Sequence, residues 1–199
     1  MRALTLDDLL PLSDFAGQRR ELFTAHCRYL DVYRRVRIGP RLTLIFENRQ
    51  TLWFRVQELL RIARLSDPAQ VQQELDLYNR LLPGRDCLQA ALVIDISQEA
   101  ILTEEMAFWQ MLGSDTLRMR IGVMSVPSNL VTSRPEDRCI GAAHWVQFPF
   151  DAHIRKQFAD PKQAVVFHVA DAAYPHESPP LSDDVRQSLC EDLEMSDRD

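Results

Sequence analysis

The sequence predicts a single α+β domain built on a mixed, largely antiparallel sheet of four to five strands, with its helices massed on one face. Some segments repeat apolar residues at three- and four-residue steps, as amphipathic helices do, while others alternate apolar and polar residues, as strands do. These segments do not follow the regular βαβ order of a parallel sheet. The length of 199 residues favours one domain, expected at residues 1–180 and followed by an acidic C-terminal tail at residues 181–199.

The first half of the chain contains three predicted helices and one strand. After a short capped segment at residues 4–10, a long helix is expected from residue 14, with Gly39 and Pro40 ending it. Residues 41–46 alternate and predict a strand. Asn48 is a candidate N-cap for the next helix. Asp67, followed by a proline, is a candidate N-cap for a third helix that runs to about residue 82.

The second half is predicted to supply the remaining strands. Residues 88–96 are almost entirely apolar, which is typical of a central strand covered on both faces. A helix is expected at residues 97–112, a short one near 151–158, and strands at 117–124, 139–150 and 164–169. Residues 182–199 are rich in Asp and Glu, and they predict one weak helix that frays into the acidic tail.

Composition argues against several classes of protein. The longest aliphatic run, residues 90–94, is far shorter than the roughly 20 residues of a membrane span. Asp7 and Asp8 interrupt the apolar stretch that a signal peptide needs. The four cysteines are widely separated and lack the spacing of a zinc or redox motif. We therefore expect a cytoplasmic protein with reduced cysteines and no membrane association.

Charge disfavours a nucleic-acid partner, because the chain carries a net charge of −6 and shows no recognised nucleic-acid-binding module. The local exception is residues 34–64, which contain eight arginines and only two glutamates. Clustered arginines bind phosphate or an acidic partner in some proteins. The interpretation that we favour is a solvated helix face, with further arginines neutralised by the acidic second half of the chain.

The motifs of many common enzymes are absent. The chain has no Walker loop, GxGxxG, GxSxG or HExxH motif and no pair of CxxC motifs. With only six glycines it also offers no glycine-rich backbone cradle for a phosphate. Most nucleotide-dependent enzymes and serine hydrolases are thereby disfavoured, and we expect no cofactor.

The most polar candidate site lies where the strand at residues 41–46 passes into the next helix. Glu47, Asn48 and Arg49 form this junction, and polar side chains continue along the helix at Gln57, Glu58 and Arg61. The free N–H groups of a helix N-terminus attract anions, so these residues could line a polar cleft. A purely structural interpretation is equally complete: Asn48 caps the helix, and the glutamates pair with nearby arginines.

Two further polar groups could join this cleft. Glu74 and Tyr78 lie four residues apart on one predicted helix face, with Asn79 beside them, and the alternative is that they bond each other. His144 alternates in step with apolar residues of its predicted strand, so its side chain should point into the interior. It could act there as an acid, a base or a metal ligand, or it could be a core histidine whose hydrogen bonds are satisfied. A metal could bind only at a tertiary cluster such as His26, His144, Glu47 and Glu74, and we predict no metal site.

Several segments resemble an uncharacterised bacterial family of domains of unknown function, family three-five-zero-one. The resemblance is carried by residues 4–10 (LTLDDLL), 38–40 (IGP), 42–44 (LTL), 46–49 (FENR), 57–61 (QELLR), 74–76 (ELD), 78–79 (YN), 82–84 (LPG) and 143–144 (AH). The resemblance therefore spans the chain to about residue 150. The stretch after Leu181 departs from it and looks like a tail specific to this chain. The word FENR with the following QE is its most specific part.

This resemblance implies a function only by association. Members of the family look like neighbours of rubrerythrin-type di-iron proteins and of iron–sulfur oxidoreductase subunits. The chain itself lacks the cysteine pattern of an iron–sulfur protein and the paired Glu-x-x-His motif of a di-iron site. The first hypothesis is therefore a non-catalytic accessory or binding protein for a redox partner. The alternative is a small enzyme that binds an anionic substrate around Glu47, Asn48, Arg49 and His144.

Overall fold

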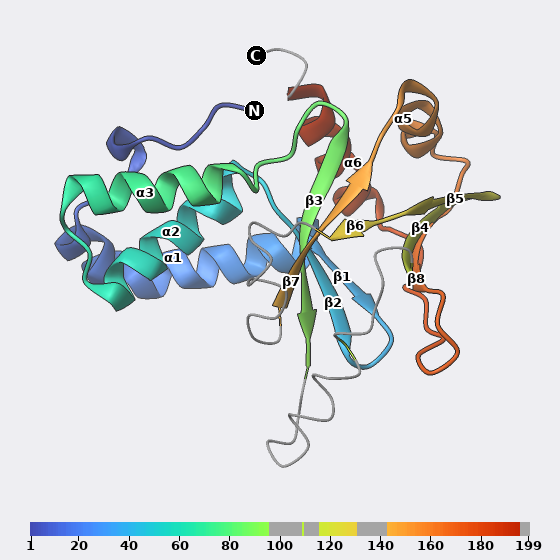
Figure 1. Ribbon diagram of the computed structural model, residues 1–199, viewed down its shortest axis with the longest axis horizontal. Helices are drawn as coiled ribbons and strands as arrows, with labels where there is room; N and C mark the ends of the chain where they lie inside the picture. The colour runs from blue at the N-terminus through green and yellow to red at the C-terminus, as the bar shows by residue number, and fades with distance from the viewer. Residues whose placement is uncertain (96–108, 110–115, 131–142, 196–199) are drawn as a thin grey trace.

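The computed structural model describes residues 1–95, 109, 116–130 and 143–195, which form layers of helices and antiparallel strands (Figure 1). The elements in chain order are η1 (Leu6–Asp8), α1 (Leu12–Tyr33), β1 (Arg35–Ile38), β2 (Leu42–Phe46), α2 (Arg49–Ala63), α3 (Pro68–Asn79), β3 (Cys87–Ile94), β4 (Leu117–Ile121), β5 (Met124–Pro127), β6 (Asn129–Leu130), β7 (Ala143–Pro149), α5 (Ala152–Ala159), β8 (Val165–Val169) and α6 (Asp183–Met195). The predicted single α+β domain is confirmed.

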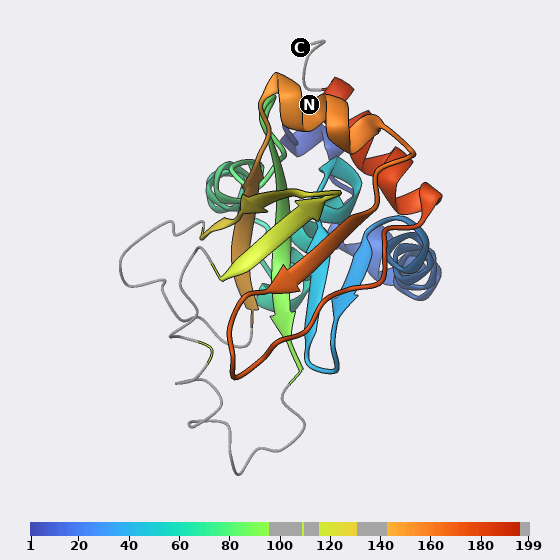
Figure 2. The ribbon, with the colours of Figure 1, turned by 90° about the vertical axis from the view of Figure 1, so that its right-hand side faces the viewer.

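The strands form two antiparallel sheets where we expected one. The larger sheet has the order β1-β2-β3-β7-β6, and the smaller has the order β5-β4-β8. Helices α1, α2 and α3 lie on one face of the larger sheet, as predicted, while the smaller sheet lies against the opposite face (Figures 1 and 2). Only Ser128 separates β5 from β6, so the chain passes directly from one sheet to the other.

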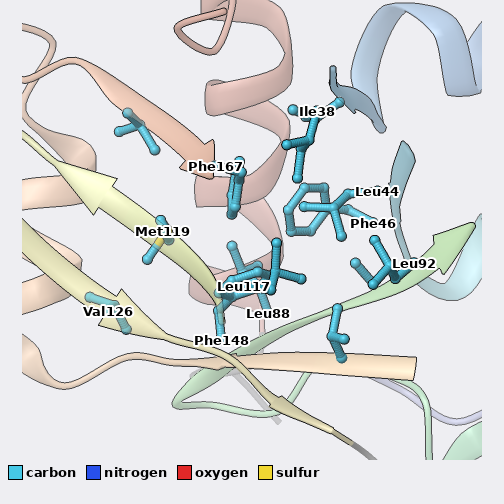
Figure 3. Close-up of a cluster of buried hydrophobic side chains, with 14 of the residues drawn as sticks. Ile38, Leu44, Phe46, Leu88, Leu92, Leu117, Met119, Val126, Phe148 and Phe167 are labelled. Carbon is cyan, nitrogen blue, oxygen red and sulfur yellow. The ribbon is translucent and has the colours of Figure 1, made fainter. Parts of the chain in front are cut away.

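The main core lies between the two sheets. Side chains of both sheets meet there, among them Leu44, Phe46, Leu88, Phe148 and Phe167 (Figure 3). Phe167 packs against Phe46 and Phe148 at ring-centroid distances of 5.3 and 5.0 Å. Alternate residues of β2 and β4 are buried, which is the pattern that the sequence showed. A second, smaller cluster joins α2 and α3 to Leu4 near the N-terminus.

Helix α1 ends at Tyr33, before the Gly39 and Pro40 that we expected to end it. We expected the helix to continue to Gly39, but Arg34 ends it and Arg35–Ile38 pairs with β2 as a hairpin. The predicted caps are correct, since Asn48 and Asp67 each accept two backbone N–H groups of the helices that they begin. The predicted helix at residues 97–112 and the start of the strand predicted at 139–150 lie outside the described residues, apart from the buried helical residue Trp109.

The C-terminal stretch packs as a helix on the core. Val185, Leu189 and Leu193 of α6 are buried in the cluster that fills the space between the sheets. Asp192 of the same helix is buried against Arg34. The core therefore extends beyond residue 181, into the stretch that we expected to form an acidic tail. Among the described residues, no helix combines the length and apolar character needed to cross a bilayer.

Candidate functional site

Asn48 serves the N-terminus of α2. Its side-chain Oδ1 accepts the backbone N–H groups of Gln50 and Thr51, both at 3.0 Å, and these are donors that an uncapped helix would leave unpaired. Its Nδ2 donates to the hydroxyl of Tyr29 on α1 at 2.8 Å. The amide therefore fastens α2 to α1 while capping it, which is the structural interpretation of this residue.

Glu47 is a buried carboxylate with two partners on α2. Its Oε2 accepts the Thr51 hydroxyl at 2.5 Å, and its Oε1 lies 2.7 Å from a guanidinium nitrogen of Arg55. The Arg55 guanidinium also lies over the Trp145 ring, 5.4 Å from the ring centroid. A buried carboxylate without such partners would cost several kcal/mol. Glu47 is thus one half of an ion pair between the end of β2 and helix α2.

Arg49, Gln57 and Asn79 hold the N-terminal segment, which we define as residues 1–11. Arg49 forms a 2.6 Å salt bridge with Asp8, which holds the pKa of that carboxyl well below its usual range. The Gln57 amide reaches the carbonyl of Leu10 at 3.5 Å. The Asn79 side chain accepts from the backbone N–H of Leu4 at 2.8 Å and donates to its carbonyl at 2.9 Å.

Glu58 and Arg61 form a separate ion-pair group with α1. Glu58 lies 2.7 Å from Arg19 and 2.9 Å from Arg61. Burial opposes ionisation of this carboxyl, but the hydrogen bonds from Arg61 and Arg19 outweigh it and lower its pKa. The predicted pairing of Glu58 with Arg61 across one turn is therefore present, and Arg19 adds a link between α1 and α2.

Tyr78 lies near the Glu47–Arg55 pair without joining an open site. Burial raises the pKa of its hydroxyl, and the charges of Arg55, Glu74 and Glu47 all act on it. No hydrogen bond between Glu74 and Tyr78 is present. Both residues are half-buried on α3, and Tyr78 packs against the hydrophobic cluster of α2 and α3.

His144 lies on the other face of the larger sheet. In β7 it shares the side of Val146 and Phe148, which face the smaller sheet, whereas Arg55 contacts the neighbouring Trp145. Its Nε2 is buried without a hydrogen-bond partner, and burial lowers its pKa. The sheet thus separates His144 from Glu47, and no group of three metal-ligating side chains occurs among the described residues.

A pocket does open beside the junction, and most of its lining was not predicted. It has a volume of about 810 Å³ and is bounded by α1, the start of α2, the N-terminal segment and α6. Its lining consists of Met1, Asp8, Tyr29, Tyr33, Arg34, Asn48, Arg49, Gln50, Trp53, Asp184, Gln187, Ser188, Glu191 and Asp192. Of the ten predicted site residues, only Asn48 and Arg49 line it. No histidine or cysteine does.

The floor of this pocket is a buried ion pair. Arg34 and Asp192 are in contact and their side chains are 3% and 4% exposed. Arg34 also donates to the Tyr29 hydroxyl at 3.0 Å. Burial raises the pKa of Asp192, and the charge of Arg34 offsets part of that rise. Sequence patterns could not find this pair, because its members lie 158 positions apart and one lay in the expected tail.

Comparison with known proteins gives a family without an assigned activity. A search of curated proteins found no match. A crystal structure of a protein from Burkholderia pseudomallei, described as novel and of unknown function, is similar with a TM-score of 0.86 and 26% identity, covering 96% of this chain and 100% of that one. Residues 3–193 match the model of a family described as a protein of unknown function, DUF3501. Because this match spans nearly the whole chain and includes most of α6, the chain belongs to the DUF3501 family.

Proposed function

We propose that this protein is a non-catalytic binding protein, an accessory to another protein. One observation carries the proposal: the predicted site residues do not converge on one open cleft. Glu47 pairs with Arg55, Arg49 with Asp8, and Glu58 with Arg61, while Asn48 caps α2 and Asn79 bonds the backbone of Leu4. Residues that move protons in an enzyme need a shared position near a reacting atom, and this arrangement supports binding instead.

The alternative is a small enzyme that uses the pocket beside Asn48 and Arg49. His144, its predicted acid or base, lies across the sheet from this junction. The two arginines of the pocket already face carboxylates, so neither is available to hold an anionic substrate without breaking an ion pair. The enzyme hypothesis therefore has less support than the binding hypothesis, although the pocket gives it a location.

The finer part of the proposal concerns the partner, for which we propose a rubrerythrin-type or iron–sulfur redox protein. Its support is the family resemblance described above. In this arrangement the partner holds the redox centre, and the present chain contributes a surface. Cys27, Cys87 and Cys190, the free cysteines among the described residues, come from α1, β3 and α6.

The test is reciprocal capture from native lysate. The tagged full-length chain should retain one partner in constant ratio, the tagged partner should retain this chain, and iron should follow the partner in the eluate. An unrelated tagged protein of similar isoelectric point serves as the control for charge. Consumption of a lysate metabolite by catalytic amounts of the purified chain, without any captured partner, would contradict the proposal and favour the enzyme.

A further inference from the structure

The N-terminal segment, residues 1–11, is attached to the helical layer in the way that a bound peptide is attached to a protein. It runs beside α3, away from both sheets (Figure 1). Among the described residues, none of residues 2–10 forms a backbone–backbone hydrogen bond with another part of the chain. Arg2, Ala3 and residues 5–7 are exposed, so one side of the segment faces solvent. Side-chain contacts therefore hold this segment in place.

Side chains of α2 and α3 bind the backbone of the segment. Asn79 on α3 accepts from the backbone N–H of Leu4 at 2.8 Å and donates to its carbonyl at 2.9 Å. On α2, the Trp53 indole donates to the carbonyl of Asp8 at 2.9 Å. Peptide-binding domains use main-chain hydrogen bonds for affinity and the burial of single side chains for specificity. Because every polypeptide carries these backbone groups, a segment of another protein can form the same bonds.

Leu4 is the buried anchor of the segment. It is 1% exposed, whereas Leu6, two residues later, is 40% exposed, and Leu9 is partly buried against the same cluster. The apolar residues of α2 and α3 that surround the anchor are each 7% exposed or less, and they are Leu52, Val56, Leu60, Val71 and Leu75. Without a covering leucine these side chains would form an apolar patch between two helices. Patches of this kind on proteins mark interaction sites.

Asp8 shapes the segment and fixes its position on α2. Its Oδ2 accepts the backbone N–H of Thr5 at 2.8 Å and the Thr5 hydroxyl at 3.0 Å, which closes the short turn η1. Its Oδ1 lies 2.6 Å from a nitrogen of Arg49 on α2 and 2.8 Å from one of Arg2 in the segment. The pattern that α2 and α3 hold is therefore a leucine followed directly by a Thr-x-x-Asp turn, at residues 4–8.

We propose that α2 and α3 form a docking surface for a segment of a partner protein, and that residues 4–8 of this chain cover the surface until the partner's segment displaces them. The partner's segment has the same chemistry, a leucine followed by Thr-x-x-Asp. This inference rests on the proposed binding function and names the surface that binds. The chain's own segment is covalently attached and competes at a high effective concentration, so it acts as an internal inhibitor of docking.

The test is a titration of full-length chains with a fluorescein-labelled, amidated peptide of residues 2–11, followed by fluorescence anisotropy. The Leu4→Ala chain, whose own segment has lost its anchor, should bind the peptide about tenfold or more tightly than the wild type does. Leu6→Ala makes the same change at an exposed position and is the matched control, which should bind like the wild type. Asp8→Asn leaves the anchor in place and should improve binding by about threefold, because an ion pair is lost.

The peptide supplies a second comparison. Leu4→Ala in the peptide should weaken its binding to the Leu4→Ala chain by about tenfold or more, whereas Leu6→Ala in the peptide should leave the binding unchanged. Absence of peptide binding to both the Leu4→Ala and the Asp8→Asn chains would overturn the proposal. Equal binding of the peptide to all four chains would overturn it too, because the peptide would then bind elsewhere.

Failure of this docking surface and failure of the proposed function give different results. In the capture from lysate, the Leu4→Ala chain should retain more partner than the wild type and the Leu6→Ala chain do. Equal retention by all three would leave the binding function intact and overturn the assignment of the partner to this surface. Peptide binding to the Leu4→Ala chain without any captured partner would support the docking surface and contradict the proposed accessory function.

Discussion

Gly39 holds the hairpin between β1 and β2 in a backbone conformation that side chains disfavour. Its φ is +63°, and a Cβ there would lie 2.6 Å from the ring of His176 and 2.7 Å from the hydroxyl of Tyr174. That hydroxyl is itself fixed, because it donates to the carbonyl of Ile38 at 2.7 Å and accepts the backbone N–H of Arg41 at 3.0 Å. The turn is thus built around the segment that follows β8.

Gly39→Ala should therefore lower the free energy of unfolding by about 2–4 kcal/mol, through backbone strain and overpacking. Gly17→Ala is the matched control, because Gly17 lies in α1 with nothing within 4 Å of its added Cβ. That substitution should stabilise the protein by roughly 0.5–1 kcal/mol, as alanine does within helices. Urea unfolding of both variants measures the difference, and equal effects would contradict this account of the turn.

His26 makes stability depend on pH. Burial, with the charges of Arg55 and Arg35, lowers its pKa to about 4, and its ring stacks on Phe54 at 4.1 Å between centroids. The unfolded state, with an ordinary pKa near 6.5, binds the proton more readily. Stability is therefore fully present above about pH 6.5 and declines as the pH falls toward about 4.

His26→Phe keeps the stacking and removes this titration. Between pH 7 and pH 5 the thermal unfolding temperature should fall less in the variant than in the wild type. The full pKa shift corresponds to at most about 3 kcal/mol, and the partial exposure of the ring reduces that figure. His153→Gln, at an exposed position of α5, should follow the wild type. Identical pH profiles for His26→Phe and wild type would show that other groups set the acid sensitivity.

At the scale of elements, local chemistry made the helix starts predictable but not the end of α1. Asn48 and Asp67 cap helices through atoms two and three residues away, so the sequence contains the whole signal. The stripe of α1 continues into residues 35–38, and the helix stops at Arg34 because Asp192 holds its side chain and Phe46 donates to its carbonyl. Asp192 lies 158 positions from Arg34, so the sequence around the helix end does not contain this signal.

Helix α6 is expected to be essential for the stability of the fold. Leu189 is fully buried, so Leu189→Ala should cost about 2–5 kcal/mol through the cavity that it leaves. Removal of residues 182–199 should abolish cooperative unfolding, because it also leaves Arg34 buried without Asp192. Calorimetry provides both measurements. The exposed Gln187→Ala should stay within about 0.5 kcal/mol of wild type, and a stable truncated protein would restore the interpretation of a tail.

At the scale of the whole molecule, alternation predicted strands but not their division between sheets. Strands β2 and β4 show the same buried and half-buried alternation, yet they belong to different sheets. Pairing is decided by contacts across the core, which leave no local pattern. For the same reason the polar site residues were found individually but their grouping was not, since Glu47 and His144 occupy opposite faces of one sheet.

The segments that carry the family resemblance meet around the N-terminal segment. Asn79 of α3 bonds both backbone groups of Leu4, Arg49 pairs with Asp8, and the Trp53 indole donates to the carbonyl of Asp8 at 2.9 Å. The segment in turn supplies Met1 and Asp8 to the pocket beside α6. Helices α2 and α3 thus fix one wall of this pocket.

Asn79→Ala should free the N-terminal segment from α3. Loss of its two hydrogen bonds to Leu4 should cost about 1–3 kcal/mol, because the Leu4 backbone loses both partners while its side chain is only 1% exposed. Hydrogen exchange should then accelerate at residues 4–10 and remain slow in β3, since local opening need not spread to the core. Asp76→Ala on the same helix is the control, because its carboxylate accepts only from the exposed Gln72. Unchanged protection at residues 4–10 would mean that Leu4, packed with Leu52 and Leu75, holds the segment by burial alone.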